Sequence, residues 1–129
     1  MTLAQRALDR LTAWPDLTAG PASCGAGRAL RSGRAEIAHF HSGRDVDLHL
    51  THRAVQRLHY DLDDSSAIHL VPGSGWVTVH LDCDADVDLL LSLVSIALKA
   101  HQTRPSSPAP GGCNFHRITV LARNAAAES

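Results

Sequence analysis

Two segments of the chain alternate between polar or amphipathic side chains and aliphatic ones, a period of two that is typical of strands in a half-exposed sheet. They are DVDLHL at 45–50 and WVTVHLD at 76–82. Each follows a short apolar segment across a glycine-containing turn, with AEIAHFH at 35–41 before the first and SAIHLV at 66–71 before the second. The pattern predicts two hairpins, and therefore an antiparallel sheet with one face on the core.

Three helices are predicted around these hairpins, at 2–14, 52–62 and 84–101, because apolar side chains recur there at helical spacing. Thr2 and Gln5 have the spacing of a capping box at the start of the first helix. The order helix, hairpin, helix, hairpin, helix predicts an α+β fold. We expect an antiparallel sheet of four to five strands with three helices packed on one face.

The chain is predicted to form one domain over residues 1–101, since 129 residues suffice for a single core. Within it, the turn-rich stretch 15–27 is predicted to be a loop, and GRALRSG at 27–33 a short strand. QTRPSSPAPGG at 102–112 has the composition of a linker. Residues 113–129 are predicted to be a short C-terminal strand and a tail, in which Cys113 and His116 are three residues apart.

Composition limits the partners and the compartment that we expect. Twelve basic residues against 13 acidic ones give no reason to expect nucleic acid or an anionic membrane. No apolar run approaches the roughly 20 residues that span a bilayer. The three cysteines form no C-x-x-C motif and no signal sequence precedes them, which predicts a cytoplasmic protein with reduced thiols. A single lysine among many alanines suggests a GC-rich genome, such as that of an actinobacterium.

The alternation of side chains across the strands places most of the histidines on one face of the sheet. Valine and leucine at alternate positions face the core, so their neighbours face away from it. Ile37 breaks the alternation, because it shares the parity of the histidines. The residues predicted on this outer face are His39, His41, Asp45, Asp47, His49, His69, Trp76, Thr78, His80 and Asp82. The candidate ligand-binding set among them is His39, His41, Asp47, His49, Trp76 and His80.

The sequence allows two interpretations of this face. Half-exposed antiparallel sheets carry solvated polar side chains by default, whereas the number of histidines and an exposed Trp76 beside them favour a binding face. On such a face, the imidazoles bind a ligand, act in acid–base chemistry or hold a transition metal. The i, i+2 pair His39 and His41 is the best metal candidate, and Asp47 joins the pair as a catalytic candidate.

Other motifs are weaker. CGAGRAL at 24–30 lacks the strand before it that a dinucleotide-binding loop requires, and no flavin or NAD signature is present. Cys83 is predicted to be buried and inert at the end of its strand. The helix at 84–101 carries more apolar residues than one buried stripe needs, which raises the possibility of a homodimer contact through Leu89, Leu93 and Ile96.

The sequence over roughly residues 28–101 resembles a family of small bacterial and fungal luciferase-family domains. The resemblance rests on the H-x-H strand (His39, His41), the D-L-x-L strand, the S-G-W-V turn and the acidic start of the last helix. This chain has His49 where arginine is common in that family. The element order is more distantly similar to the YjbR-like double-wing fold, which has been discussed as DNA-binding.

The resemblance implies no settled activity. The flavin-dependent luciferases are TIM barrels of about 250 residues, so the shared name does not imply flavin or light emission. We expect an accessory binding module that uses the histidine-rich face for a small ligand or a protein partner. The alternative is a small enzyme, for example one of secondary metabolism, using His39, His41 and Asp47 in acid–base or metal-assisted chemistry. Nucleic-acid binding is the least favoured function.

Overall fold

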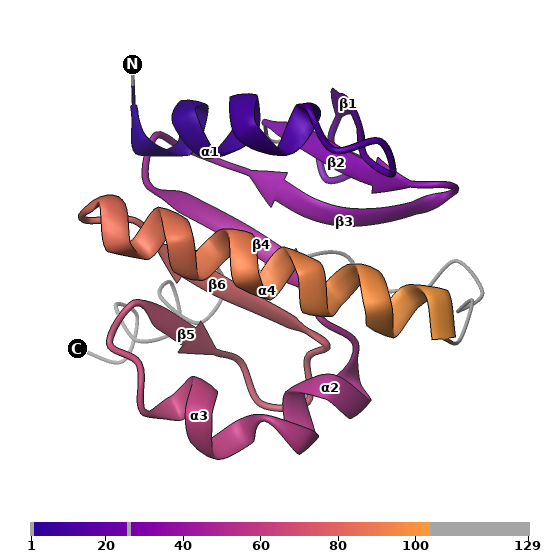
Figure 1. Ribbon diagram of the computed structural model, residues 1–129. Helices are drawn as coiled ribbons and strands as arrows, with labels where there is room; N and C mark the ends of the chain where they lie inside the picture. Colours follow the sequence, from indigo (N-terminus) through magenta and orange to yellow (C-terminus); the bar gives the residue numbers. More distant parts are fainter. Residues whose placement is uncertain (1, 26, 104–129) are drawn as a thin grey trace, which may run out of the picture.

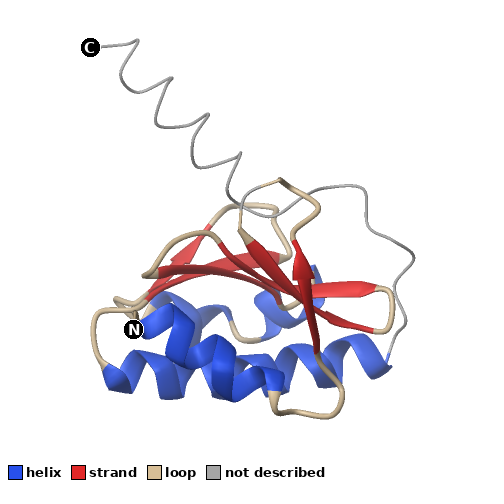
Figure 2. Cartoon of the chain, turned by 90° about the horizontal axis from the view of Figure 1, so that it is seen from above, coloured by secondary structure: helices blue, strands red, loops and turns tan. Residues whose placement is uncertain are grey.

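Six antiparallel strands form one sheet, and all the described helices lie on one side of it (Figures 1 and 2). The structure is a computed structural model that describes residues 2–25 and 27–103. The strands are β1 (Thr18–Pro21), β2 (Arg28–Ser32), β3 (Ala35–Phe40), β4 (Asp45–His49), β5 (Ile68–Leu70) and β6 (Trp76–His80). The helices are α1 (Leu3–Thr12), α2 (His52–Arg57), α3 (His59–Asp63) and α4 (Asp84–Thr103).

The strand order is β1-β2-β3-β4-β6-β5. The first four strands run back and forth as neighbours. The chain then leaves the sheet through α2 and α3, forms the edge strand β5, and returns as β6 between β5 and β4 (Figure 1). The two predicted hairpins are therefore joined side by side through β4 and β6, which makes one continuous polar face available on the side away from the helices.

The α+β class, the antiparallel sheet and the single helical layer are confirmed, whereas the numbers of elements are corrected. The described chain has six strands and four helices instead of four to five strands and three helices. The additional strand, β1, lies in the stretch predicted to be a loop and pairs with β2. The helix predicted at 52–62 is divided into α2 and α3 at Leu58, whose φ of −103° and ψ of 12° leave the helical region.

The core lies between the sheet and the helices α1 and α4. Alternate residues of the central strands, such as Val46 and Leu48 in β4, are fully buried there with the inner side of α4. The capping box of Thr2 and Gln5 is present, so the sequence signal for the start of α1 is confirmed. Fully burying an aliphatic side chain of this size contributes about 1.5–3 kcal/mol, and the buried positions fix which face of each strand points outward.

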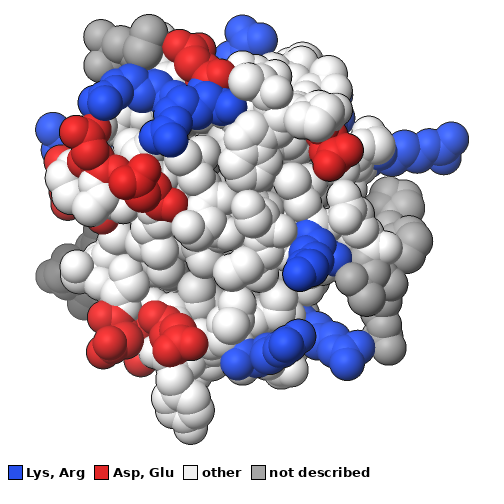
Figure 3. Space-filling model, in the orientation of Figure 1, with Lys and Arg blue, Asp and Glu red and all other residues white. Residues whose placement is uncertain are grey.

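The helix-covered side of the molecule carries charges of both signs around its rim and a largely uncharged centre (Figure 3). Two exposed ion pairs join α1 to α4, Arg6 with Asp84 at 2.8 Å and Arg10 with Asp88 at 3.5 Å. Such exposed pairs add little stability. None of the described helices is both long enough and apolar enough to cross a membrane.

The residues proposed for a homodimer contact do not form one exposed patch in the described chain. Leu93 is 5% exposed and belongs to the core, and Leu89 is partly buried against it. Ile96 is exposed. The broad apolar character of α4 is thus explained largely by burial, and the homodimer stays a prediction that would depend on Ile96.

Two further expectations concern cysteines and the C-terminal segment. Cys83 is exposed, not buried as predicted, because it follows the last strand at the start of α4, where its thiol lies 3.6 Å from the Asp86 carboxylate. The helix α4 continues to Thr103, two residues into the predicted linker. The rest of that linker and the strand and tail predicted at 113–129 lie outside the described residues.

Candidate functional site

The outer face of the sheet carries the polar side chains that the alternation predicts. We call it the histidine face. Cross-strand pairing places His39 opposite Asp47, Asp47 opposite Thr78, and Thr78 opposite His69, in one row over four strands. Two further pairs flank this row, Asp45 with His80 and His49 with Trp76. The outward direction predicted for these side chains of β3, β4, β5 and β6 is therefore confirmed.

The centre of the histidine face is buried, so a uniformly solvated face is excluded. His39 and Asp47 are each 1% exposed. Trp76 is 7% exposed, which corrects the expectation that its indole would be open to solvent. The rings of His39 and His49 lie 4.7 and 4.8 Å from the Trp76 ring and cover it. The margins of the face, at His69, His80 and Asp82, are exposed.

A β-bulge in β3 brings an unforeseen carboxylate onto this face. Leu30 pairs with Ala38, but the next residue, Arg31, pairs with Glu36, so β3 contains one extra residue, Ile37. In a regular strand, residues three apart point to opposite faces. Because the bulge shifts the alternation by one residue, Ile37 turns into the core and Glu36 joins His39 on the histidine face.

The Glu36 carboxylate fixes the His39 ring. Glu36 Oε1 lies 3.2 Å from His39 Nε2 and accepts a 2.9 Å hydrogen bond from the backbone N–H of Ser23. Burial alone would raise the pKa of Glu36, but hydrogen bonding from Ser23 and the charges of His39 and Arg31 lower it overall. The group is therefore a carboxylate that only accepts, so His39 donates from Nε2 and, when neutral, carries its lone pair on Nδ1.

The loop between β1 and β2 places a thiol beside that lone pair. Cys24 Sγ lies 3.5 Å from His39 Nδ1. The loop is closed by a hydrogen bond from the N–H of Ala22 to the carbonyl of Gly27. Gly27 has a φ of +86°, and a Cβ there would lie 1.9 Å from the carbonyl oxygen of Phe40. Only glycine lets the loop approach β3 so closely, and this approach brings Cys24 to His39.

His41 is held by a second carboxylate. Its Nε2 lies 3.2 Å from Asp47 Oδ2, and Thr78 Oγ1 donates to Asp47 Oδ1 at 2.6 Å. Asp47 is nearly fully buried, and both of its oxygens are hydrogen-bonded. The arrangement repeats that of Glu36 and His39, since Nε2 of His41 donates to a carboxylate and Nδ1 becomes the acceptor nitrogen of the neutral ring.

Cys24, His39 and His41 form the central cluster of the face. One potential ligand atom from each lies within 4.8 Å of the other two. Burial lowers the pKa of His39, although the Glu36 carboxylate opposes this effect. At neutral pH the cluster therefore offers a sulfur and neutral imidazole, the donor types that transition metals and thiol–imidazole chemistry use.

A second group of rings lies at the other end of the face. His49 stacks on Trp76 and meets His101 of α4 edge-on at 4.6 Å. Burial, with a smaller contribution from His101 and His39, lowers the pKa of His49 to about 4, and burial also lowers the pKa of His101. His101 Nε2 donates to the carbonyl of His49 at 3.0 Å, while its buried Nδ1 has no hydrogen-bond partner among residues 2–25 and 27–103. Both rings are neutral at physiological pH.

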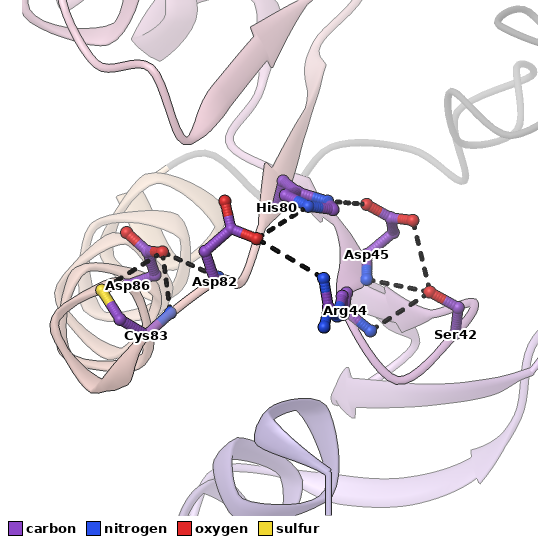
Figure 4. Close-up of polar contacts among 7 residues, drawn as sticks. All are labelled: Ser42, Arg44, Asp45, His80, Asp82, Cys83 and Asp86. Carbon is purple, nitrogen blue, oxygen red and sulfur yellow. Dashed lines mark hydrogen bonds and ion pairs between the residues drawn. The ribbon is translucent and has the colours of Figure 1, made fainter.

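His80 belongs to an exposed network of charged side chains at the margin of the face (Figure 4). Its Nδ1 lies 2.7 Å from Asp45 Oδ1 and its Nε2 3.1 Å from Asp82 Oδ1. The Asp82 carboxylate also lies 3.8 Å from the Arg44 guanidinium. The hydrogen bond to Asp45 is the main reason that the pKa of His80 is raised.

The structure thus separates the six predicted ligand-binding residues. His39, His41 and Asp47 come together, Trp76 packs beside them, and His49 and His80 lie in two other groups. The sequence reasoning missed Cys24, Glu36 and His101. The broken alternation at Ile37 was a visible signal of the bulge that brings in Glu36. Sequence spacing gave no comparable signal for the loop cysteine or for the helix histidine.

Comparison with known proteins locates a family domain within this fold. A family model described as Luciferase domain matches residues 34–97, from the start of β3 into the second half of α4. The span includes His39, His41 and Asp47 but not Cys24. A search of the curated proteins and a search of the solved structures each found no match. Residues 34–97 of this chain therefore match the Luciferase domain family, which confirms the resemblance over that span.

Proposed function

We propose that the domain is a binding module that holds a small ligand at the cluster of Cys24, His39 and His41. The observation that carries this proposal is the pair of carboxylate–imidazole contacts, Glu36 with His39 and Asp47 with His41, each at 3.2 Å. Each carboxylate fixes the orientation of one ring through Nε2. The rings are thereby prepared to accept a ligand through the other nitrogen.

The burial of the cluster favours a small ligand over a protein partner. His39 and Asp47 have almost no exposed surface, whereas the side chains of a protein interface must be reachable by the partner. Cys24 is only partly buried, so an ion or small molecule has an approach at the loop between β1 and β2. A partner surface, if one exists, would have to use the exposed margin at His69 and His80.

The energetics of burial also support a role beyond folding. Taking ionised and polar groups out of water costs several kcal/mol, and well-packed apolar residues often stabilise a fold as well or better. Two adjacent carboxylate–imidazole pairs, each joined by a hydrogen bond and largely removed from solvent, are a common feature of functional sites. The fold itself needs no such set, because α1 and α4 already bury the other face of the sheet.

Native mass spectrometry of the untagged protein tests the binding module. We expect a mass in excess of the chain under native conditions that disappears on denaturation. The excess should be lost in His39→Gln and kept in His69→Gln, since His69 lies on the same face but is exposed. The same mass excess over the chain in the wild type and in His39→Gln, including no excess in either, would contradict the proposal.

A thiol–imidazole enzyme is the second candidate, favoured by the alignment of Cys24, His39 and Glu36. The 3.5 Å contact from Sγ to Nδ1 and the 3.2 Å contact from Nε2 to the carboxylate have the order of a nucleophile, a base and an orienting acid. The predicted combination of His39, His41 and Asp47 stays a separate prediction, in which Asp47 orients His41.

Alkylation by iodoacetamide tests this second candidate by measuring how fast the Cys24 thiol reacts. Cys83 is the internal control, because its thiol lies beside the Asp86 carboxylate. In a Cys113→Ser background, Cys24 should react faster than the more exposed Cys83. His39→Gln should slow Cys24 by about tenfold or more and leave Cys83 unchanged. A rate at Cys24 that does not respond to His39→Gln would exclude His39 as a base.

A further inference from the structure

We propose that the ligand of this module is a divalent transition-metal ion, bound by Cys24 Sγ and by the Nδ1 atoms of His39 and His41. The inference rests on the proposed function and names the ligand for the same cluster. Three protein donors leave at least one coordination position for water or another small ligand, as in zinc sites that are not purely structural.

The separation of the donors fits tetrahedral coordination. A zinc–sulfur bond of ~2.3 Å and a zinc–nitrogen bond of ~2.0 Å at a tetrahedral angle place the two donor atoms ~3.5 Å apart. The distance from Cys24 Sγ to His39 Nδ1 is 3.5 Å. One ring nitrogen of His41 lies within 4.8 Å of the other two donor atoms.

The surrounding hydrogen bonds are those that metal-binding histidines require. A histidine that binds a metal through one nitrogen usually donates the other N–H to a carboxylate or a carbonyl group. Both histidines do so here, His39 to Glu36 and His41 to Asp47. These carboxylates are themselves held, Glu36 by the Ser23 N–H and Asp47 by the Thr78 hydroxyl.

The charges and donor types select the class of ion. Metal binding would require Cys24 as the thiolate. Together with the Glu36 and Asp47 carboxylates that contact the two imidazoles, it would place three negative charges around the ion, which favours a dication. Sulfur and imidazole nitrogen suit zinc, cobalt, nickel or copper. Calcium and magnesium prefer oxygen ligands and would be poorly served by this set.

Cobalt titration monitored by visible absorption is the direct test, because Co²⁺ replaces zinc and reports its own geometry and ligands. The chain is used without a histidine tag, after chelator treatment, in a Cys83→Ser, Cys113→Ser background. We expect one equivalent of Co²⁺ to give intense bands typical of tetrahedral coordination and a thiolate-to-cobalt charge-transfer band. One equivalent of Zn²⁺ should remove both.

The variants assign the ligands. Cys24→Ser should lose the charge-transfer band. His39→Gln and His41→Gln should each weaken Co²⁺ binding by at least about 100-fold. That factor is the largest loss expected for a residue that only orients a metal ligand, so losing a ligand itself should cost at least as much. His69→Gln and His80→Gln are matched controls from the same face and should bind as the wild type does. Circular dichroism of each variant shows whether its fold is retained.

The wild-type spectrum decides the proposal even if a variant does not fold. Weak octahedral bands without a charge-transfer band in the folded wild type would overturn the metal site. If native mass spectrometry then still shows a bound species that depends on His39, the binding module stands with a different ligand. If neither a metal nor a bound species is found, both proposals fail.

Discussion

Glu36 and His39 are three residues apart in one strand, and yet their side chains lie on the same face and contact each other at 3.2 Å. The extra residue Ile37 in the pairing of β3 with β2 accounts for this. Bulges occur often next to functional sites, where they redirect a side chain. Here the bulge supplies an orienting carboxylate to the imidazole at the centre of the candidate site.

Replacing that carboxylate should weaken metal binding without removing a ligand. Glu36→Gln keeps the size of the side chain but removes its negative charge. The new amide can form a hydrogen bond with His39 through either its oxygen or its nitrogen, so it no longer fixes the tautomer of the ring. We expect a loss of about 10- to 100-fold in Co²⁺ affinity, the range for orienting partners of metal ligands. Isothermal titration calorimetry measures it, with the exposed substitution Asp63→Asn as the control. An unchanged affinity would mean that Glu36 does not orient His39.

The close approach of Gly27 to β3 predicts a contrast between two glycine substitutions in one loop. Gly25 and Gly27 both have positive φ, but a Cβ on Gly25 meets nothing within 4 Å, whereas one on Gly27 meets the Phe40 carbonyl at 1.9 Å. Gly25→Ala should lower the free energy of unfolding by about 1 kcal/mol. Gly27→Ala should lower it by about 3 kcal/mol, since backbone strain and overlap are added. Urea unfolding of both variants checks the difference.

The sequence predicts the histidine face better than it predicts the site. Strict alternation in β4 and β6 sets which side chains face outward, and the fold confirms the parity of Asp47 and Thr78. Parity does not say which outward residues meet. Contacts such as that of Cys24 with His39 depend on how a loop crosses a neighbouring strand. The position of Gly27 against Phe40 decides that crossing, and it is a tertiary relationship with no local pattern.

The buried histidines predict a loss of stability on acidification. The pKa of His49 is lowered to about 4 in the folded chain from an ordinary 6.5, so between these values the unfolded chain binds more protons. The free energy of unfolding should therefore fall as pH drops from about 6.5 to about 4, by about 3 kcal/mol from this residue. His39 and His101, whose pKa values are also lowered, act in the same direction.

Denaturation of the metal-free protein at a series of pH values measures this dependence. His49→Gln should flatten it, since a glutamine does not titrate, and the exposed substitution His52→Gln should leave the slope as in the wild type. The raised pKa of His80 has the opposite sign, because its stabilisation is present at low pH and lost as pH rises through that value. Its exposed position keeps that contribution small.

Thr51 offers a test of backbone strain beside the site. Its φ of 81° and ψ of 150° are unfavourable for a β-branched residue, but its hydroxyl caps α2 by accepting from the N–H of Ala54. Thr51→Gly relieves strain of about 1–3 kcal/mol and loses only a few tenths of a kcal/mol of capping. We expect a net gain in thermal stability. Thr51→Ala loses the cap and keeps the strain, so it should melt at a lower temperature than the wild type.

The sulfur of the proposed site and its two imidazoles come from parts of the chain with different freedom to change. His39 and His41 lie in or directly after a strand whose alternate residues form the core, whereas Cys24 lies in a loop outside the Luciferase domain at 34–97. Loops tolerate substitution far more readily than buried strands. Replacing the loop residue Cys24 by aspartate or histidine would therefore change the metal-binding atoms without altering the sheet. Members of the family could in this way diverge in ligand preference while keeping the same sheet.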